Sequence, residues 1–138
     1  MKLSTFVLAI CLLMTACSQN TNTQEKNVQK ASITTTSAKK LRHVVLFKFK
    51  EETTVADIKK VEAAFSALPS KIPEIKSYEW GTDNSPEGLA KGFTHCFFLT
   101  FDSEEGRAVY LPHPAHKAFG AVLTPHLEDV LVLDYWAD

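Results

Sequence analysis

The stretch RHVVLFKFK, residues 42–50, has the alternating side chains typical of a β-strand. Val, Leu and Phe favour extended structure, and successive side chains of a strand point to opposite faces. His43 and Phe47 therefore share one face, whereas Val44 and Leu46 share the other. Because both faces carry large apolar residues, the strand must be covered on both sides of its sheet.

The other apolar segments predict three further strands and the helices between them. The predicted strands cover residues 41–50, 75–82, 93–101 and 129–136. The predicted helices cover residues 54–68, 103–110 and 114–123. Thr54 and Ser103 are residue types that favour a helix N-cap. The order is βαββαβ, so we expect an α+β, ferredoxin-like fold with a four-stranded antiparallel sheet and helices on one face.

Helices on one face leave the second face of this sheet uncovered. The apolar candidates, on one side of the sheet or the other, are Val44, Leu46, Phe98, Leu131 and Leu133. A monomer would expose them as a large patch, which soluble proteins rarely do. We therefore expect a homodimer through the sheet face, formed about a twofold axis. A monomer with one poorly covered face is the alternative.

The N-terminal region predicts export. Lys2 precedes an apolar run at residues 3–14, which is too short to span a bilayer. The run ends in MTAC at residues 14–17, which resembles a lipobox, so Cys17 is the expected lipidation site. Its acyl chains would anchor the protein to a bacterial membrane, outside the cytoplasm. A plain secretory signal cut near Ala16 is the alternative.

The chain accordingly divides into three parts. Residues 1–16 are the expected signal peptide. Residues 17–40 begin with the lipidated cysteine and continue as a polar tether, which we expect to be disordered because it has little apolar surface to bury. Residues 41–138 form the expected folded domain.

Composition excludes several classes of site. The formal net charge is −1, so no basic surface is predicted to bind nucleic acid. Cys96 is the one cysteine within residues 41–138; this excludes an internal disulfide and a cysteine-based metal site there, and we expect a buried, inert thiol. His113 and His116 could supply two metal ligands, but their spacing fixes no carboxylate or thiol beside them. We predict no metal site.

Four segments together resemble the stress-responsive dimeric α/β-barrel (Dabb) domain family. The first is the strand at residues 42–50; the others are GFTH at 92–95, YLPHPAH at 110–116 and VLDY at 132–135. The resemblance covers residues 41–136 in order. It implies a ferredoxin-like protomer and a homodimer whose sheets form a barrel.

The same resemblance suggests candidate catalytic residues. A plant polyketide cyclase of this family closes its substrate by an aldol-type condensation, using histidines and a tyrosine without cofactor or metal. The positions that match its catalytic motif are His43, Tyr110 and His116. A further pocket tyrosine falls at Phe65, which lacks the hydroxyl and puts the cyclase substrate in doubt.

The histidines support two interpretations. If the first and third strands are adjacent and parallel, as we expect, His43 and His95 approach each other at one end. Separately, a neutral His116 could act as general base while the Tyr110 hydroxyl donates to a substrate oxygen. Phe65, His95 and His113 are the expected ligand-binding residues. Alternatively these histidines are structural, with His113 simply fixing the helix break.

Two functions therefore remain open. The first is a stress-associated module that binds a small apolar or carbonyl-bearing molecule. The second is a cofactor-independent enzyme, a lyase, cyclase or monooxygenase, with histidine as general base.

Overall fold

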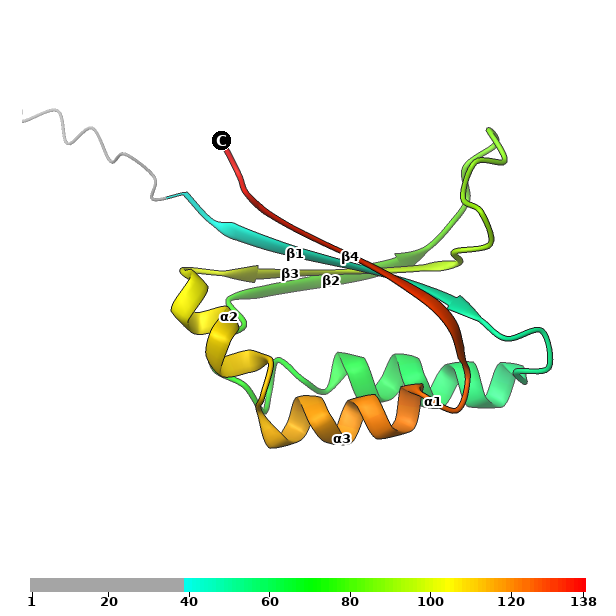
Figure 1. Ribbon diagram of the computed structural model, residues 1–138, viewed down its shortest axis with the longest axis horizontal. Coiled ribbons are helices and arrows are strands. Elements are labelled where there is room, and N and C mark those ends of the chain that lie inside the picture. The colour runs from blue at the N-terminus through cyan, green and yellow to red at the C-terminus, as the bar shows by residue number, and fades with distance from the viewer. Residues whose placement is uncertain (1–38) are drawn as a thin grey trace, which may run out of the picture. The chain divides into compact units, whose positions relative to one another are not determined.

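The computed structural model describes residues 39–138 (Figure 1). The predicted signal peptide, the lipidation site Cys17 and nearly all of the predicted tether lie outside the described residues. Within residues 39–138, no helix is long and apolar enough to cross a membrane.

Seven elements follow one another in the predicted order, with the second helical segment in two pieces. They are β1 (Leu41–Phe49), α1 (Val55–Ser66), β2 (Ser77–Thr82), β3 (His95–Phe101), α2 (Glu104–Tyr110), α3 (Pro114–Leu123) and β4 (Leu127–Trp136). β2 and β3 start two residues later than predicted because turns occupy the preceding backbone: the Ile75 N–H donates to Ile72 and the Phe93 N–H to Ala90. The N-caps Thr54 and Ser103 are confirmed, and each side chain accepts a backbone N–H of its helix.

The four strands form one antiparallel sheet in the order β2-β3-β1-β4. This confirms the ferredoxin-like fold, but the expected parallel pairing of the first and third strands is wrong. The crossover through α1 makes β2 parallel to β1, and the reversal between β2 and β3 then makes β3 antiparallel to β1. His43 therefore lies opposite Leu99, and His95 lies opposite Phe47.

The helices cover one face of the sheet, called here the inner face (Figure 1). Alternate residues of β1 and β3 point to it and form a core with α1 and α3. Its fully buried aromatic side chains are Phe47, Phe65, Phe97, Phe101 and Tyr110. Burial of this apolar area is the main term that stabilises the fold.

The opposite, outer face of the sheet is apolar and uncovered in the protomer. The register pairs Val44 with Leu133 and Leu46 with Leu131, so these side chains share that face. Leu131 and Leu133 are 43% and 53% exposed. Cys96, opposite Leu46, is only half-buried in the protomer, less than the buried thiol that the sequence predicted. The segment between β2 and β3 rises on this side (Figure 1).

Candidate functional site

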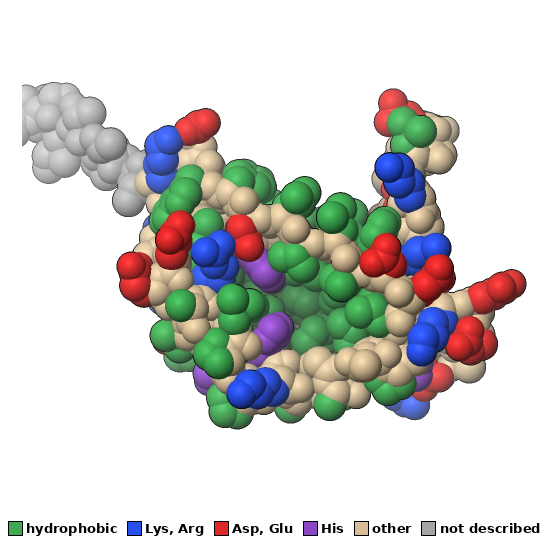
Figure 2. Space-filling view, viewed as in Figure 1, with side chains coloured by type: hydrophobic (Ala, Val, Ile, Leu, Met, Phe, Trp, Pro, Cys, Tyr) green, Lys and Arg blue, Asp and Glu red, His purple; other side chains and the backbone are tan. Residues whose placement is uncertain are grey.

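A cavity of about 450 Å³ lies between the inner face of the sheet and helices α2 and α3. Figure 2 shows the corresponding hollow, with apolar side chains inside it and histidines at its margin. The lining residues are His43, Val45, Phe47, Phe65, Tyr110, Leu111, His116, Phe119, Gly120, Leu123, Val130, Val132 and Asp134. The cavity is thus apolar over most of its wall and polar at one end.

His43 enters the polar end from β1 and is held by the neighbouring edge strand. Its Nδ1 atom lies 2.8 Å from Oδ1 of Asp134, which faces it directly on β4. A carboxylate accepts hydrogen bonds, so Nδ1 carries the proton and Nε2 is the basic atom of the neutral ring. Burial lowers the pKa of His43, and this outweighs the hydrogen bond and charge of Asp134, which act to raise it.

Tyr110 and His116 come together across the break between α2 and α3. Their ring centroids are 4.3 Å apart, and Tyr110 lies 5.6 Å from His43. The His116 Nδ1–H donates to the Leu111 carbonyl at 2.9 Å, which leaves Nε2 unprotonated in the neutral ring. Burial, with the nearby charge of Asp134, raises the pKa of the Tyr110 hydroxyl, so it remains a hydrogen-bond donor at neutral pH.

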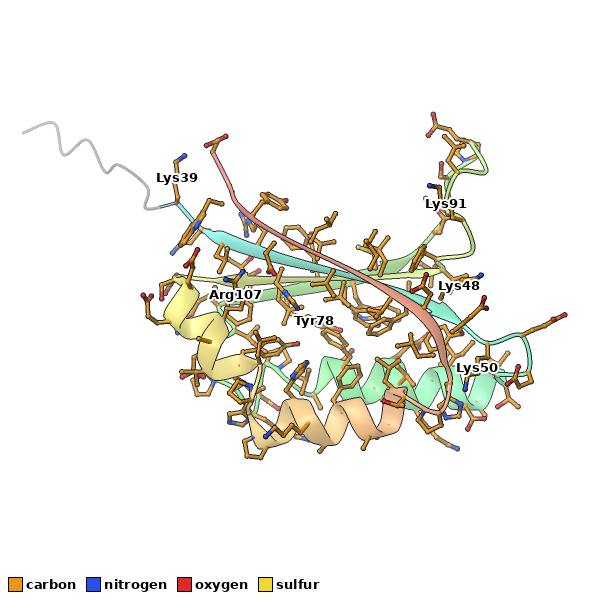
Figure 3. The ribbon with its side chains drawn as sticks, in the orientation of Figure 1. Lys39, Lys48, Lys50, Tyr78, Lys91 and Arg107 are labelled. Carbon is orange, nitrogen blue, oxygen red and sulfur yellow. The ribbon has the colours of Figure 1, made fainter. Side chains whose placement is uncertain are left out.

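The apolar wall of the cavity is largely aromatic. Phe65 lies 4.7 Å from Phe119 and 6.0 Å from Phe47, measured between ring centroids. Tyr78 stacks on Phe65 at 5.8 Å, but its hydroxyl pairs with Ser66 and it does not line the cavity. Figure 3 shows Tyr78 between the sheet and the helices. This wall suits an apolar molecule rather than a polar one.

The structure places His95 away from this cavity. It is buried at the other end of the inner face, where its Nε2 lies 3.2 Å from Glu62 of α1 and its Nδ1 lies 2.8 Å from the Thr94 hydroxyl. Phe49 packs against its edge at 5.1 Å. The expected approach of His43 and His95 fails because β1 and β3 are antiparallel. His95 instead borders a second hollow, of about 440 Å³, beneath the segment between β2 and β3.

His113 also lies outside the cavity lining. It is the N-cap of α3, and its Nδ1 accepts the Ala115 N–H at 3.1 Å. Pro114 then occupies the first turn, where a missing N–H costs nothing. The observed contacts of His113 are those of a residue that fixes the helix break.

Two charged residues at the polar end were not predicted from the sequence. Asp134 contacts His43, and Arg107 of α2 contacts the same carboxylate, with Nη1 3.2 Å from Oδ2. The one signal for Asp134 is a charge that directly follows the four apolar residues 130–133 of the terminal strand. Nothing local marks Arg107, which lies on a short helix among other charged residues.

Over residues 39–138, no three His, Cys, Asp or Glu side chains gather closely enough to hold a metal ion.

An antiparallel four-stranded sheet with helices on one face, and a cavity under it with two histidines at one end, places this chain in the class of α+β, ferredoxin-like proteins. The chain belongs to the Dabb family, the stress responsive A/B barrel domain, whose family model matches residues 41–137.

Three relatives have named activities or assemblies that bear on function. Olivetolic acid cyclase from Cannabis sativa is 35% identical over 95 residues, which cover 69% of this chain and 94% of the cyclase. The hydroxynitrile lyase from Passiflora edulis is 30% identical with a TM-score of 0.69, over 73% of this chain and 95% of the lyase. A dimeric ferredoxin-like protein of unknown function from Thermobifida fusca is 32% identical with a TM-score of 0.62, over 73% and 93%.

Proposed function

We propose that the cavity between the inner face and α3 binds a small molecule with an apolar body and a carbonyl or similar oxygen. One observation carries this: an aromatic-walled space of about 450 Å³ has its donors and acceptors, His43, Tyr110 and His116, gathered at one end. Volumes of this order with few convergent polar groups are typical of ligand pockets. The apolar wall would bury the body, and the polar end would orient the oxygen.

The test is thermal stabilisation by a matched pair of probes. 4-Phenyl-2-butanone offers a ring and a carbonyl, and butylbenzene offers the same body without the oxygen. We expect the ketone to stabilise the protein more than the hydrocarbon does, and the difference to shrink in Tyr110→Phe. Tyr78→Phe is the control, because it removes a hydroxyl next to the wall but outside the cavity. Equal stabilisation by both probes in every variant would count against the proposal.

A second candidate is cofactor-independent catalysis at the same end. It is favoured by the fixed ring of His116, whose Nδ1–H is bound to the Leu111 carbonyl while Nε2 is free to take a proton. His116 would remove a proton from the carbon beside a substrate carbonyl, and the Tyr110 hydroxyl would donate to the oxygen as charge develops there. Two relatives that are named as a cyclase and a lyase support this reaction class.

Hydrogen exchange tests the catalytic candidate without knowledge of the natural substrate. A general base beside a carbonyl exchanges the α-hydrogens of a bound ketone with deuterium in D₂O. We expect the chain to accelerate exchange at the α-carbons of 4-phenyl-2-butanone, followed by proton NMR, and His116→Gln to lose most of the acceleration. Acceleration that survives in His116→Gln would exclude His116 as the base. Stabilisation without exchange would leave binding as the function.

We also propose that two copies pair through the outer face. The proposal is supported by the exposed side chains of Leu131 and Leu133 and by their cross-strand partners, Val44 and Leu46. The relative from Thermobifida fusca, which is described as dimeric, supports it as well. Light scattering on residues 41–138 is expected to give twice the protomer mass, and Leu131→Lys to lower it. A mass of one protomer at every concentration would refute the dimer.

The N-terminal motif supports a third proposal, an extracytoplasmic site of action. We propose that Cys17 carries lipid and anchors the domain to a bacterial membrane. Labelled palmitate should be incorporated by the full chain in cells and lost in Cys17→Ala, with Cys11→Ala as the control. Incorporation that persists without Cys17 would overturn the anchor.

A further inference from the structure

One charged residue at the cavity contacts neither of the candidate catalytic histidines directly. Arg107 reaches from α2 toward β4 (Figure 3) and pairs with Asp134 at 3.2 Å. The two oxygens of that carboxylate are divided: Oδ1 accepts from His43 at 2.8 Å, and Oδ2 faces Arg107. A single side chain of β4 therefore links the histidine of β1 to the guanidinium of α2.

The charge of Asp134 acts against the neutral form of His43, whereas burial favours that form. A carboxylate within hydrogen-bond distance favours the imidazolium, and only a neutral ring can accept a proton or a hydrogen bond at Nε2. A permanent positive charge on the other oxygen offsets that effect, and arginine supplies one at every relevant pH.

We propose that Arg107 is a positioning residue of the cavity, which shares the Asp134 carboxylate with His43 and thereby keeps His43 a neutral ring with Nε2 available. The inference rests on the proposed function, because a neutral His43 is what a carbonyl ligand or a transferred proton would need. Arg107 stands three residues before Tyr110, so one side of α2 brings both to the same end of the cavity.

The side chains that surround His43, taken element by element, agree with this role for Arg107. Asp134 comes from β4, Arg107 and Tyr110 from α2, and His116 from α3, while β3 presents the apolar Leu99. The charges of His116 and Arg107 act with burial to lower the pKa of His43, and Asp134 is the group that acts to raise it. Arg107 is the arginine that contacts this carboxylate, so its removal leaves only burial and His116 to oppose Asp134 and should raise the pKa of His43.

The test measures the protonation of His43 itself in the full-length chain. The ring C–H resonances of His43 are followed by NMR as a function of pH, with His43→Gln used to assign them. Arg107→Gln is expected to move the titration midpoint upward. Lys117→Gln is the matched control, since it removes the same charge from an exposed position on α3 and should leave the midpoint in place. An unchanged or lower midpoint in Arg107→Gln overturns the proposal.

Two further variants separate charge from simple structural support. Arg107→Lys keeps the charge and should restore most of the original midpoint; a full upward shift in this variant overturns the role assigned to charge. In an Asp134→Asn background, Arg107→Gln should shift the midpoint less, because the carboxylate through which Arg107 acts is gone. An undiminished shift would show that Arg107 does not act through Asp134. If Arg107→Gln does not fold, Arg107→Leu, which keeps aliphatic packing, takes its place.

The result is independent of any ligand. Failure of the ketone probes with a normal Arg107→Gln shift would remove the proposed function and leave the Arg107–Asp134–His43 relation standing. Binding of the probes without a shift in Arg107→Gln would keep the proposed function and remove the Arg107–Asp134–His43 relation.

Discussion

The inner face of the sheet carries two buried histidines, each paired with a carboxylate, at opposite ends. His43 pairs with Asp134 at 2.8 Å, and His95 pairs with Glu62 at 3.2 Å. The surroundings of the two pairs differ. The Glu62 and His95 side chains are 9% and 7% exposed, packed between α1 and the sheet, whereas the Asp134 side chain is 30% exposed beside an open cavity.

A buried histidine–carboxylate pair is therefore not enough to define a binding site. At the His95 end both ring nitrogens are occupied, Nε2 by Glu62 and Nδ1 by the Thr94 hydroxyl. At the His43 end the carboxylate holds Nδ1, and the ring borders empty space beside Tyr110 and His116. The first arrangement has the character of structural support, and the second that of a binding end.

Removal of the two carboxylates should separate these roles most strongly. Loss of Glu62 leaves the buried Nε2 of His95 without its hydrogen-bond partner, and an unsatisfied buried group of this kind costs about 2 kcal/mol. Glu62→Ala should lower the free energy of unfolding by that amount. Asp134→Ala should cost about 1 kcal/mol, the usual loss for one hydrogen bond near solvent. Urea denaturation measures both.

The control for these truncations is Glu51→Ala, which removes an exposed carboxylate from the turn before α1 and should change stability little. Equal losses in Glu62→Ala and Asp134→Ala would mean that both ends are structural. The contrast drawn between the two histidines would then be wrong.

Local patterns predicted the elements but not which ends of them meet. Alternation along residues 42–50 placed His43 and Phe47 on the same face, and Thr54 and Ser103 marked their helix starts, because these features depend on a few neighbouring residues. The direction of β3 relative to β1 depends on the whole chain path. The sequence interpretation therefore paired His43 with His95, which is wrong.

The partners of His43 were missed for the same reason. The contact with Asp134 depends on the register between β1 and β4, and His43 and Asp134 are 91 positions apart in the sequence. Arg107 depends in addition on how α2 is oriented over β4. Tyr110 and His116 were proposed by family resemblance, and their contact across the break at Pro112 requires the turn that lets His116 donate to Leu111.

A smaller effect is expected from placing a side chain in the cavity, which would make its wall more like the packed surroundings of His95. Gly120 lines the cavity, and a Cβ atom built there meets no heavy atom within 4 Å. Gly120→Ala should therefore stabilise α3 by up to about 1 kcal/mol, since alanine favours a helix more than glycine does. It should also weaken binding of 4-phenyl-2-butanone, because the methyl group occupies part of the cavity wall.

Gly106→Ala in α2 is the matched helical control. Its Cβ would make ordinary contacts, 3.8 Å from Glu74 and 3.9 Å from Phe101, and Gly106 does not line the cavity. It should stabilise the protein without changing probe binding. Thermal melts with and without the ketone measure both effects. Unchanged binding in Gly120→Ala would show that the ligand does not reach α3.

The smallest expected effect is the dependence of stability on pH that His43 confers. Burial, which outweighs the adjacent Asp134, lowers the pKa of His43 in the folded protein below its ordinary value of 6.5. As the pH falls below about 6.5, the unfolded chain takes up a proton that the folded chain does not. The contribution of His43 to the free energy of unfolding is therefore complete above that pH, declines below it, and levels off under the folded pKa.

His43→Gln, which can still donate to Asp134 but does not titrate, should flatten the slope between about pH 7.5 and pH 5.5 in urea denaturation series. Tyr110→Phe, a change in the same cavity, should keep the slope because burial raises the pKa of that hydroxyl away from this range. If His43→Gln and the parent chain have the same slope, His43 does not enter the folded state as the neutral ring on which the contrast with His95 depends.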